Sequence, residues 1–323
     1  MVNSYNQNLD PDPANYQPLT PLSFLERASD VFPDFVAIIH GSQRFTYREF
    51  YTRSKQLASA LSQHGMTRGS TVSTLLMNTP PMLEAHYGIP MCGAVIHAIN
   101  TRLDPATIAF QLDHADSQIL LFDQELSSVI YEVLGLCKVK PLLVCYQDEQ
   151  ADTKDSSQDS TSISHKVIDY EKFIEVGDPD YQWLMPENEW DAISVGYTSG
   201  TTGDPKGVVS HHRGAYLLAQ GNALVASMPK HSVYLWTLPM FHCNGWCFPW
   251  TLSAIIGTHV CLRQVRAEPI WQSIKDHKIS HLCGAPIVMS IILSMENQQD
   301  FQPEHQVQFF TAAAPPPENR EKI

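Results

Sequence analysis

The sequence lacks a concentration of basic side chains. Its 21 lysines and arginines are outnumbered by 34 aspartates and glutamates, so the net charge is −13 with histidine neutral. No basic cluster is denser than Lys138 with Lys140. Proteins that follow a phosphate backbone carry a basic face. The composition therefore argues against a nucleic-acid-binding function and favours a small-molecule ligand.

Long apolar runs and a secretion signal are also absent. The longest apolar stretches, such as residues 285–295, fall short of the roughly 20 residues that cross a bilayer. Residues 1–10 are polar, and the seven cysteines are an odd number in a long chain, which is typical of reduced thiols. We therefore expect a soluble, cytoplasmic protein. The final residues 321–323, Glu-Lys-Ile, do not form the Ser-Lys-Leu type of peroxisomal address.

Short apolar runs alternate with helical patterns along the chain, which predicts an α/β fold with helices packed on sheets. The hydrophobic content of 43% suffices for a sizeable core. The expected strands are short, apolar and flanked by turn-forming residues: 35–40, 71–77, 94–98, 118–122, 141–145, 192–197, 233–238, 258–262, 280–282 and 307–311.

Helix starts and one polar loop are also readable. Thr46 with Glu49 three residues later predicts a capping box, and Thr20 before Pro21 predicts another helix start. Residues Phe50, Leu57, Ala60 and Leu61 would form one apolar helix face. Residues 148–164 are rich in Asp, Ser, Thr and Gln, which predicts a solvated loop without a binding role.

The most informative segment is 197–208, Tyr-Thr-Ser-Gly-Thr-Thr-Gly-Asp-Pro-Lys-Gly-Val, which follows a predicted strand and leads into an apolar helical pattern. Its glycines let the main chain approach a ligand closely. Successive backbone N–H groups and hydroxyls can converge on an anion, and Lys206 adds a positive charge. The segment predicts a phosphate-binding loop, with a solvent-exposed Gly/Ser/Thr loop as the alternative.

This loop is neither the P-loop of NTPases, because Pro205 precedes Lys206 and no Ser or Thr follows, nor the kinase glycine loop. Over residues 198–206 it resembles the phosphate-binding signature of the adenylate-forming superfamily. Further segments fall in the order and spacing of plant-type acyl-activating enzymes. The motif at 240–246 resembles that of short- and medium-chain or aromatic acyl-CoA ligases related to 4-coumarate–CoA ligase. The segments that resemble plant-type acyl-activating enzymes are residues 100–103, 212–214, 238–246, 284–286 and 311–317.

The resemblance implies a reaction and its site residues. A carboxylic acid would be activated by ATP to an acyl-adenylate and then captured by coenzyme A as a thioester. Four residues would be catalytic: Lys206, Thr201, Thr202 and His242. Residues that would bind the nucleotide are Thr198, Ser199, Gly200, Thr201, Thr202, Gly203 and Lys206 at the phosphates, and Ala312, Ala313 and Ala314 at the adenine.

The resemblance also implies a domain organisation: one incomplete AMP-binding domain over residues 1–323. Its sub-domains would comprise about residues 70–225 and residues 1–69 with 230–323, with a flexible polar loop at 147–165. The segments of relatives that carry the Mg²⁺-binding glutamate, the ribose-binding aspartate and the mobile C-terminal domain are not found before Ile323. We therefore expect a C-terminally truncated and impaired ligase. Two alternatives are a non-catalytic nucleotide- or acyl-binding protein and an unstable product without a role.

Some features depart from the family or stay open. Relatives place glycine at one of the positions of Ala312 and Ala313, where this chain has alanine at both. Trp246 and Phe248 are interpreted as pocket wall. No metal ligands are assigned, because neither His211–His212 nor the group His242, Cys243 and Cys247 offers four well-spaced zinc ligands. The acid is open among alkanoate, branched and aromatic acids, and relatives of full length leave a peroxisomal location as an alternative.

Overall fold

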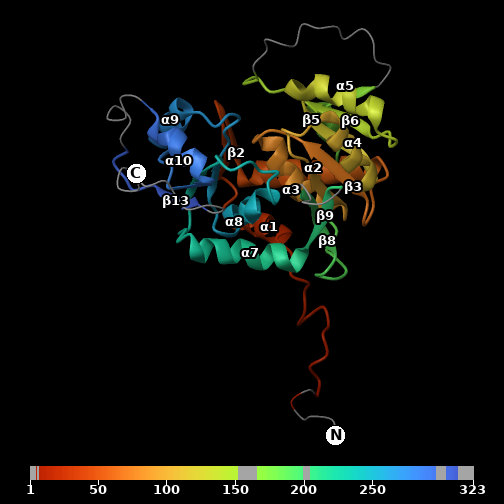
Figure 1. Ribbon diagram of the computed structural model, residues 1–323. Coiled ribbons are helices and arrows are strands. Elements are labelled where there is room, and N and C mark those ends of the chain that lie inside the picture. The colour runs from red at the N-terminus through yellow and green to blue at the C-terminus, as the bar shows by residue number, and fades with distance from the viewer. Residues whose placement is uncertain (1–4, 6, 152–165, 199–203, 296–302, 312–323) are drawn as a thin grey trace.

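The computed structural model describes residue 5 and residues 7–151, 166–198, 204–295 and 303–311. Within these residues the chain forms two β-sheets with helices packed on them, which confirms the predicted α/β class (Figure 1). A seven-stranded sheet has the order β7-β6-β5-β3-β4-β8-β9. Its strands are β3 (Thr71–Leu75), β4 (Val95–Ala98), β5 (Ser117–Asp123), β6 (Leu142–Tyr146), β7 (Val167–Asp169), β8 (Ala192–Thr198) and β9 (Lys206–His211).

The second sheet has six strands in the described part of the chain, in the order β13-β12-β10-β11-β1-β2. Its strands are β1 (Val36–His40), β2 (Gln43–Thr46), β10 (Val233–Leu235), β11 (Thr258–Val260), β12 (His281–Gly284) and β13 (Gln308–Thr311). Neighbouring strands are parallel in both sheets except at the pairs β1–β2 and β8–β9. We propose that the sheets mark the two sub-domains expected near residues 70–225 and near 1–69 with 230–323.

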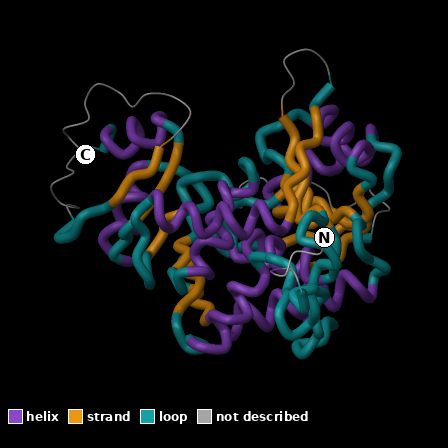
Figure 2. Tube along the Cα trace, turned by 90° about the horizontal axis from the view of Figure 1, so that it is seen from below, coloured by secondary structure: helices purple, strands orange, loops and turns teal. Residues whose placement is uncertain are grey.

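Helices cover the sheets and fill the space between them (Figure 2). Helix α2 packs against α3, and α7 contacts both the β8–β9 hairpin and α8, so it runs from one half of the molecule to the other (Figure 1). The helices are α1 (Leu22–Val31), α2 (Tyr47–Gln63), α3 (Pro80–Met91), α4 (Pro105–His114), α5 (Ser127–Leu136), α6 (Tyr170–Glu175), α7 (His212–Val225), α8 (Phe248–Ala254), α9 (Ala267–His277) and α10 (Pro286–Leu293).

The largest hydrophobic core is shared between the two halves. It joins Ile96 of the seven-stranded sheet to Ile38 of the six-stranded sheet through side chains of α1, α2, α3 and α8. The buried Tyr87 hydroxyl of α3 adds a polar link between the halves by donating to the Pro249 carbonyl at 3.2 Å, whereas the Tyr47 hydroxyl donates to the Gly257 carbonyl at 2.7 Å within the half that contains the six-stranded sheet. The two halves are therefore joined by apolar packing and by hydrogen bonds across it.

Every predicted strand is present within a few residues, and three strands were not expected. The three are β2, β7 and β9, and each is the outermost strand of its sheet. An edge strand exposed to solvent needs no apolar alternation, and β9 is exposed over almost its whole length. Strand β10 is shorter than predicted because, beyond Leu235, the carbonyls of Trp236 and Leu238 accept hydrogen bonds from the side chain of Asn78 instead of from a strand.

Two predicted helix starts had different outcomes. The capping box of Thr46 and Glu49 is confirmed, with each residue bonding the backbone N–H of the other. Helix α1 begins at Leu22 with Pro21 as its N-cap, one residue later than Thr20 predicted. The apolar face of α2 at Phe50, Leu57, Ala60 and Leu61 is fully buried, as expected.

The prediction for the start of the polar loop was wrong at Asp148, which is buried rather than solvated. Most of that loop, residues 152–165, lies outside the described residues. Asp148 accepts hydrogen bonds from His40 at 2.8 Å and from Arg263 at 2.7 Å, and Arg263 also pairs with Asp123 at 2.8 Å. Burial opposes ionisation, but these hydrogen bonds outweigh it and hold the pKa of Asp148 at about 2.

This group, Asp123, Asp148, Arg263 and His40, connects the two sheets. Asp123 ends β5 and Asp148 follows β6, whereas His40 ends β1 and Arg263 follows β11. Glu125 also pairs with the Arg263 guanidinium, at 3.0 Å. The polar composition of residues 148–164 suggested solvent exposure. The sequence alone does not show that the fold places His40 and Arg263 beside Asp148.

Candidate active site

A cavity of about 770 Å³ lies between the β8–β9 hairpin and the segment that follows β10. It opens beside the carboxyl ends of the strands β4 and β8, at Ala98 and Thr198, which is where α/β sheets commonly bind ligands. Its described lining comprises Ala98, Asn100, Leu103, Thr107, Gln111, Gly196, Tyr197, Thr198, Pro205, Val208, Ser210, Phe241, His242, Cys243 and Asn244.

The glycine-rich segment connects two antiparallel strands, β8 and β9, rather than a strand and a helix. Thr198 ends β8, Lys206 begins β9, and the two residues face each other across the antiparallel pair. Thr198 and Pro205 line the cavity, so both ends of the loop are at its edge. Lys206 is exposed at the start of β9. The remaining predicted loop residues, Ser199, Gly200, Thr201, Thr202 and Gly203, lie outside the described residues, as do Ala312, Ala313 and Ala314.

His242 lies on the opposite wall, exposed and lining the same cavity as Thr198. Its backbone N–H donates to the Pro239 carbonyl at 3.1 Å. The amide of Asn78 positions this segment: it accepts from the Met240 N–H at 2.8 Å and donates to the Leu238 carbonyl at 3.0 Å. Asn78, a buried residue of the loop after β3, therefore determines the position of the segment that carries His242. Nothing in the sequence around Asn78 indicated this role.

The chain after His242 makes a left-handed turn. Residues 243–247 all have positive φ values, from 42° at Cys243 to 62° at Cys247. Only Gly245 adopts such angles without cost, and a Cβ there would meet the Trp236 ring at 3.0 Å. Residues other than glycine cost roughly 1–2 kcal/mol each in this conformation. Backbone strain of this kind is concentrated at functional sites. The Asn222 side chain holds the turn by donating to the Trp246 carbonyl at 2.6 Å.

The turn brings two further residues to the cavity that sequence reasoning did not single out as site residues. Cys243 is exposed there. Asn244 is only 5% exposed, and its Nδ2 has no hydrogen-bond partner among the described residues. Cys247 is buried, and burial, with a smaller effect of Cys243, raises the pKa of its thiol to about 12. The left-handed turn thus places Cys243 and Asn244 in the lining of the cavity and Cys247 in the protein interior.

The paired histidines at the junction of β9 and α7 have structural partners. His211 caps α7 by accepting from the Gly214 N–H at 2.8 Å. The imidazole of His212 is 2.9 Å from the Thr20 hydroxyl, and its burial lowers its pKa to about 4. Within the described residues no three His, Cys, Asp or Glu side chains are grouped so as to hold a metal ion.

The cavity has an uncharged lining. None of its described lining residues is Lys, Arg, Asp or Glu. An anionic ligand there would depend on hydrogen-bond donors for its stabilisation, together with the charge of Lys206 at the hairpin. This arrangement suits a ligand that presents an anionic tail to the hairpin and a smaller polar group to the wall around His242.

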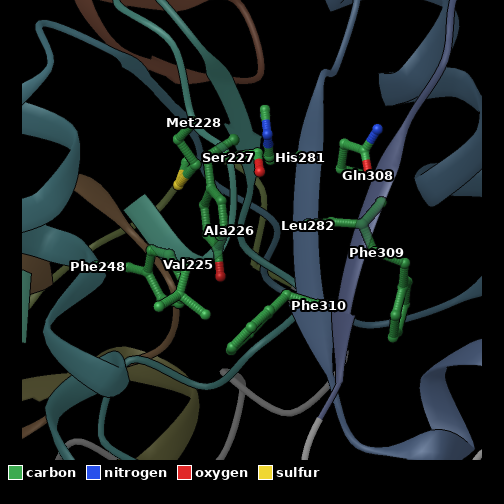
Figure 3. Close-up of a pocket in the computed structure, with 11 residues that line it drawn as sticks. Val225, Ala226, Ser227, Met228, Phe248, His281, Leu282, Gln308, Phe309 and Phe310 are labelled. Carbon is green, nitrogen blue, oxygen red and sulfur yellow. The ribbon is translucent and has the colours of Figure 1, made fainter. Parts of the chain in front are cut away.

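A second, smaller cavity of about 210 Å³ lies beside β12 and β13 (Figure 3). Figure 3 shows Phe310 pointing towards Phe248 and Val225, whereas the neighbouring Phe309 points the other way. Phe310 also packs edge-on against Trp246, with ring centroids 6.1 Å apart. Phe248 is thus the wall residue expected, although the cavity that it lines is this smaller one.

The AMP-binding enzyme family matches residues 25–322. Similar curated proteins include the peroxisomal acetate/butyrate–CoA ligase AAE7 of Arabidopsis thaliana, 45% identical over 313 residues, which are 94% of this chain and 54% of AAE7. Acetate–CoA ligase CCL3 of Humulus lupulus is 43% identical over 325 residues, 98% of this chain and 57% of CCL3. The chain thus spans little more than half the length of these curated relatives.

Solved structures share the fold. The N-terminal domain of FACL13 from Mycobacterium tuberculosis matches with a TM-score of 0.78 and 23% identity, covering 93% of this chain and 71% of that one. The anthranilate CoA ligase AuaEII, solved in complex with anthranoyl-AMP, matches with a TM-score of 0.78 and 20% identity, covering 90% and 55%. At these identities the likeness supports the fold, and the site must be argued from the residues of this chain.

Proposed function

The chain belongs to the AMP-binding enzyme family, and from this premise we propose that it carries the ATP- and acid-binding part of an acyl-CoA ligase. In the proposed first step a carboxylate oxygen of the acid attacks the α-phosphorus of ATP, and pyrophosphate leaves. In the second, the sulfur of coenzyme A attacks the acyl carbonyl carbon, loses its proton, and AMP leaves. The products are acyl-CoA, AMP and pyrophosphate.

The observation that carries this proposal is the cavity shared by Thr198 and Pro205, at the two ends of the glycine-rich loop, and by His242 on the opposite wall. The loop between them, with Thr201 and Thr202, would hold the β- and γ-phosphates by backbone N–H groups and hydroxyls. Lys206, at the start of β9, would neutralise part of their charge. Alignment and charge stabilisation, rather than covalent chemistry of the protein, would lower the barrier.

His242 would stand where the acid meets the α-phosphate, because it lines the same cavity as Thr198 and Pro205 of the hairpin. Ala312, Ala313 and Ala314, which follow β13, would lie against the adenine. Mg²⁺ is typical of ATP-dependent chemistry of this kind. The described residues supply no three-ligand group for it, so no step is assigned to a metal here.

We propose a short-chain carboxylic acid as substrate and coenzyme A as the acceptor. Relatives at 40% to 45% identity are named as ligases of acetate, butyrate and 2-methylpropanoate. The cavity of about 770 Å³ has room for such an acid beside a nucleotide. Branched acids are also candidate substrates, because one of these relatives is named as a 2-methylpropanoate ligase. Aromatic acids are kept as candidates too, because the structure gives no separate argument against them.

We propose a cytoplasmic location. Three similar relatives are named as peroxisomal, which makes that compartment the alternative. None of the helices in the described ranges combines the length and apolar character that spanning a bilayer requires. Imaging of the chain fused at its N-terminus to a fluorescent protein distinguishes the two compartments.

The test combines binding with turnover. We expect isothermal titration to detect ATP and AMP binding by the 323-residue chain. Pyrophosphate release should then be measured with acetate, butyrate, 2-methylpropanoate and benzoate. Acid-dependent release supports the ligase. Nucleotide binding without release with any acid supports instead the non-catalytic binding protein, and an absence of binding to ATP, AMP and every acid overturns the proposal.

A further inference from the structure

The candidate active-site cavity lies where two neighbouring strands of the seven-stranded sheet continue in opposite directions. After β4 the chain passes through α4 to β5, which lies beyond β3, whereas after β8 it turns back into the edge strand β9. In α/β sheets, ligands bind in the crevice that such a divergence leaves at the carboxyl ends of the strands. The topology of the sheet therefore explains the position of this cavity.

The six-stranded sheet contains the same arrangement. After β11 the chain passes through α9 to β12, which lies beyond β10, whereas after β1 it turns back into the edge strand β2. Strands β11 and β1 are parallel neighbours, as β4 and β8 are. A third cavity, of about 620 Å³, lies at this point, and we call it the β11–β1 cavity. Its described lining comes from the carboxyl ends of β11 and β1, from β2 and from α9, just as β4, β8, β9 and α4 contribute to the candidate active-site cavity.

The β11–β1 cavity differs from the candidate active-site cavity by having charged groups in its lining. Arg44 extends from β2, and its Nη1 donates to the Gly41 carbonyl at 2.8 Å, which holds the guanidinium over the turn. On the other side, the last turn of α9 contributes His277 and Asp276, and the Asp276 carboxylate accepts from the Gln272 side chain at 2.7 Å. The cavity therefore lies between an arginine of the hairpin and a histidine of the helix.

The charge on Arg44 acts on His277. Burial lowers the pKa of the half-buried His277 imidazole, the Arg44 guanidinium lowers it further, and Asp276 partly opposes the two effects. A dianion placed between the guanidinium and the imidazole would favour the charged form of both groups. A carboxylate supplies one negative charge, whereas a phosphate monoester supplies about 1.5 to 2 at neutral pH. The two groups together thus suit a phosphate better than a carboxylate.

The floor of the β11–β1 cavity is apolar. Val260 and Leu262 are buried there, and Ile39 packs against the same core. We propose that this cavity binds a small phosphate monoester, with its phosphate between Arg44 and His277 and its apolar part over the floor. The proposal is independent of the proposed function, because the two cavities share no described lining residue.

Two substitutions remove the proposed phosphate contacts. Arg44→Gln and His277→Gln each replace a group that can carry a positive charge by a neutral one, at positions that solvent reaches. Arg48→Gln is the matched control, because Arg48 is an exposed arginine that lines neither cavity. Lys206→Ala is a second control, which removes the cation of the glycine-rich hairpin. The thermal unfolding midpoint of each variant verifies that it folds.

The probes are phenyl phosphate and inorganic phosphate, each titrated calorimetrically up to millimolar concentration. We expect Arg44→Gln and His277→Gln each to weaken binding of phenyl phosphate by about 10-fold or more, and the two controls to change it by less than about 2-fold. Any of three results overturns the proposal: no binding of phenyl phosphate, equal affinity for inorganic phosphate, or unchanged binding in both variants. A loss with Lys206→Ala would place the probe at the hairpin and would overturn it too.

Proton NMR gives a second readout that a merely structural role would not move. The Hε1 resonance of His277 can be assigned by its absence from the spectrum of His277→Gln. We expect added phenyl phosphate to shift this resonance towards its imidazolium position at constant, neutral pH, because a bound dianion raises the pKa of the ring. A resonance that does not move at saturation contradicts a phosphate beside His277.

Discussion

Asn78 accepts a hydrogen bond from the backbone N–H of Met240 at 2.8 Å while its amide nitrogen donates to the carbonyls of Trp236 and Leu238. The side chain is 7% exposed and uses both ends of its amide. It comes from the seven-stranded half, and the backbone that it holds continues from β10 to His242. One residue thus fixes the wall of the cavity to the other half of the molecule.

Substitution Asn78→Ala should destabilise the chain. It removes three hydrogen bonds and leaves buried backbone groups unpaired, so we expect the free energy of unfolding to fall by about 2–4 kcal/mol. Urea denaturation followed by circular dichroism measures it. The exposed Asn188→Ala should change stability by no more than about 0.5 kcal/mol. A loss below about 1 kcal/mol for Asn78→Ala would show that the segment is held by other contacts.

Arg263→Met should be more costly than loss of an exposed arginine. The substitution leaves the carboxylates of Asp123 and Asp148 buried without their shared cation, for which we expect a loss of about 3–5 kcal/mol. Arg48 and Asp34 form an exposed pair, with side chains 63% and 86% exposed, so Arg48→Met should cost at most about 1 kcal/mol. Equal unfolding midpoints for the two variants would contradict the connecting role of Arg263.

The sequence allowed most of the fold to be predicted, because buried strands such as β3 and β5 carry apolar runs that the core requires. It did not predict β9, since an exposed edge strand is held by backbone bonds to β8 alone and its side chains are free to be polar. At the site, the motif around His242 was readable. The roles of Asn78 and Asn222 were not, because the partners of their amides are residues far along the chain.

Stability should fall as the pH is lowered from about 6.5 towards 4. Burial lowers the pKa of His86 and His97 to about 4 and, with a smaller effect of His86, that of His259 to about 3. As the pH falls, these histidines therefore become protonated in the unfolded chain before they do so in the folded chain. Their contribution to the free energy of unfolding is fully present above pH 6.5 and is lost progressively below it. Urea midpoints at pH 7.5 and 5.0 measure this loss.

His259→Gln is the informative variant for this pH dependence. The Trp236 indole N–H donates to His259 at 3.1 Å, and a glutamine oxygen can accept the same bond. The variant should lose less stability between the two pH values than the unsubstituted chain does. An identical loss would mean that His259 contributes nothing to acid sensitivity.

Cys243 should react first with alkylating reagents. It is exposed in the cavity, whereas the other six cysteines are buried. Burial also raises the pKa of Cys283 and Cys145 to about 12, which keeps these thiols protonated and unreactive. Brief treatment with iodoacetamide and peptide mass spectrometry should find the label on Cys243. Bound butyryl-sulfamoyl-adenosine, an inert analogue of an acyl-adenylate, should slow this labelling. Labelling at the same rate with the ligand present would place the ligand elsewhere.

Lys206→Ala should weaken ATP binding by about 10- to 100-fold, because a charge-assisted bond to phosphate is worth roughly 1.5–3 kcal/mol. AMP lacks the β- and γ-phosphates, so its affinity should change little. Titration calorimetry with both nucleotides measures the contrast, and Lys172→Ala, on the short helix α6, is the matched control. A parallel loss of ATP and AMP affinity would argue against a β- or γ-phosphate contact.

The cavity draws one wall from the hairpin of the seven-stranded sheet and the other from the chain beyond β10. An occupant that contacts both walls joins the two halves from outside their common core. Its binding free energy then opposes their separation. If the empty chain melts in two stages on heating, saturation with such an occupant should merge them into a single cooperative transition.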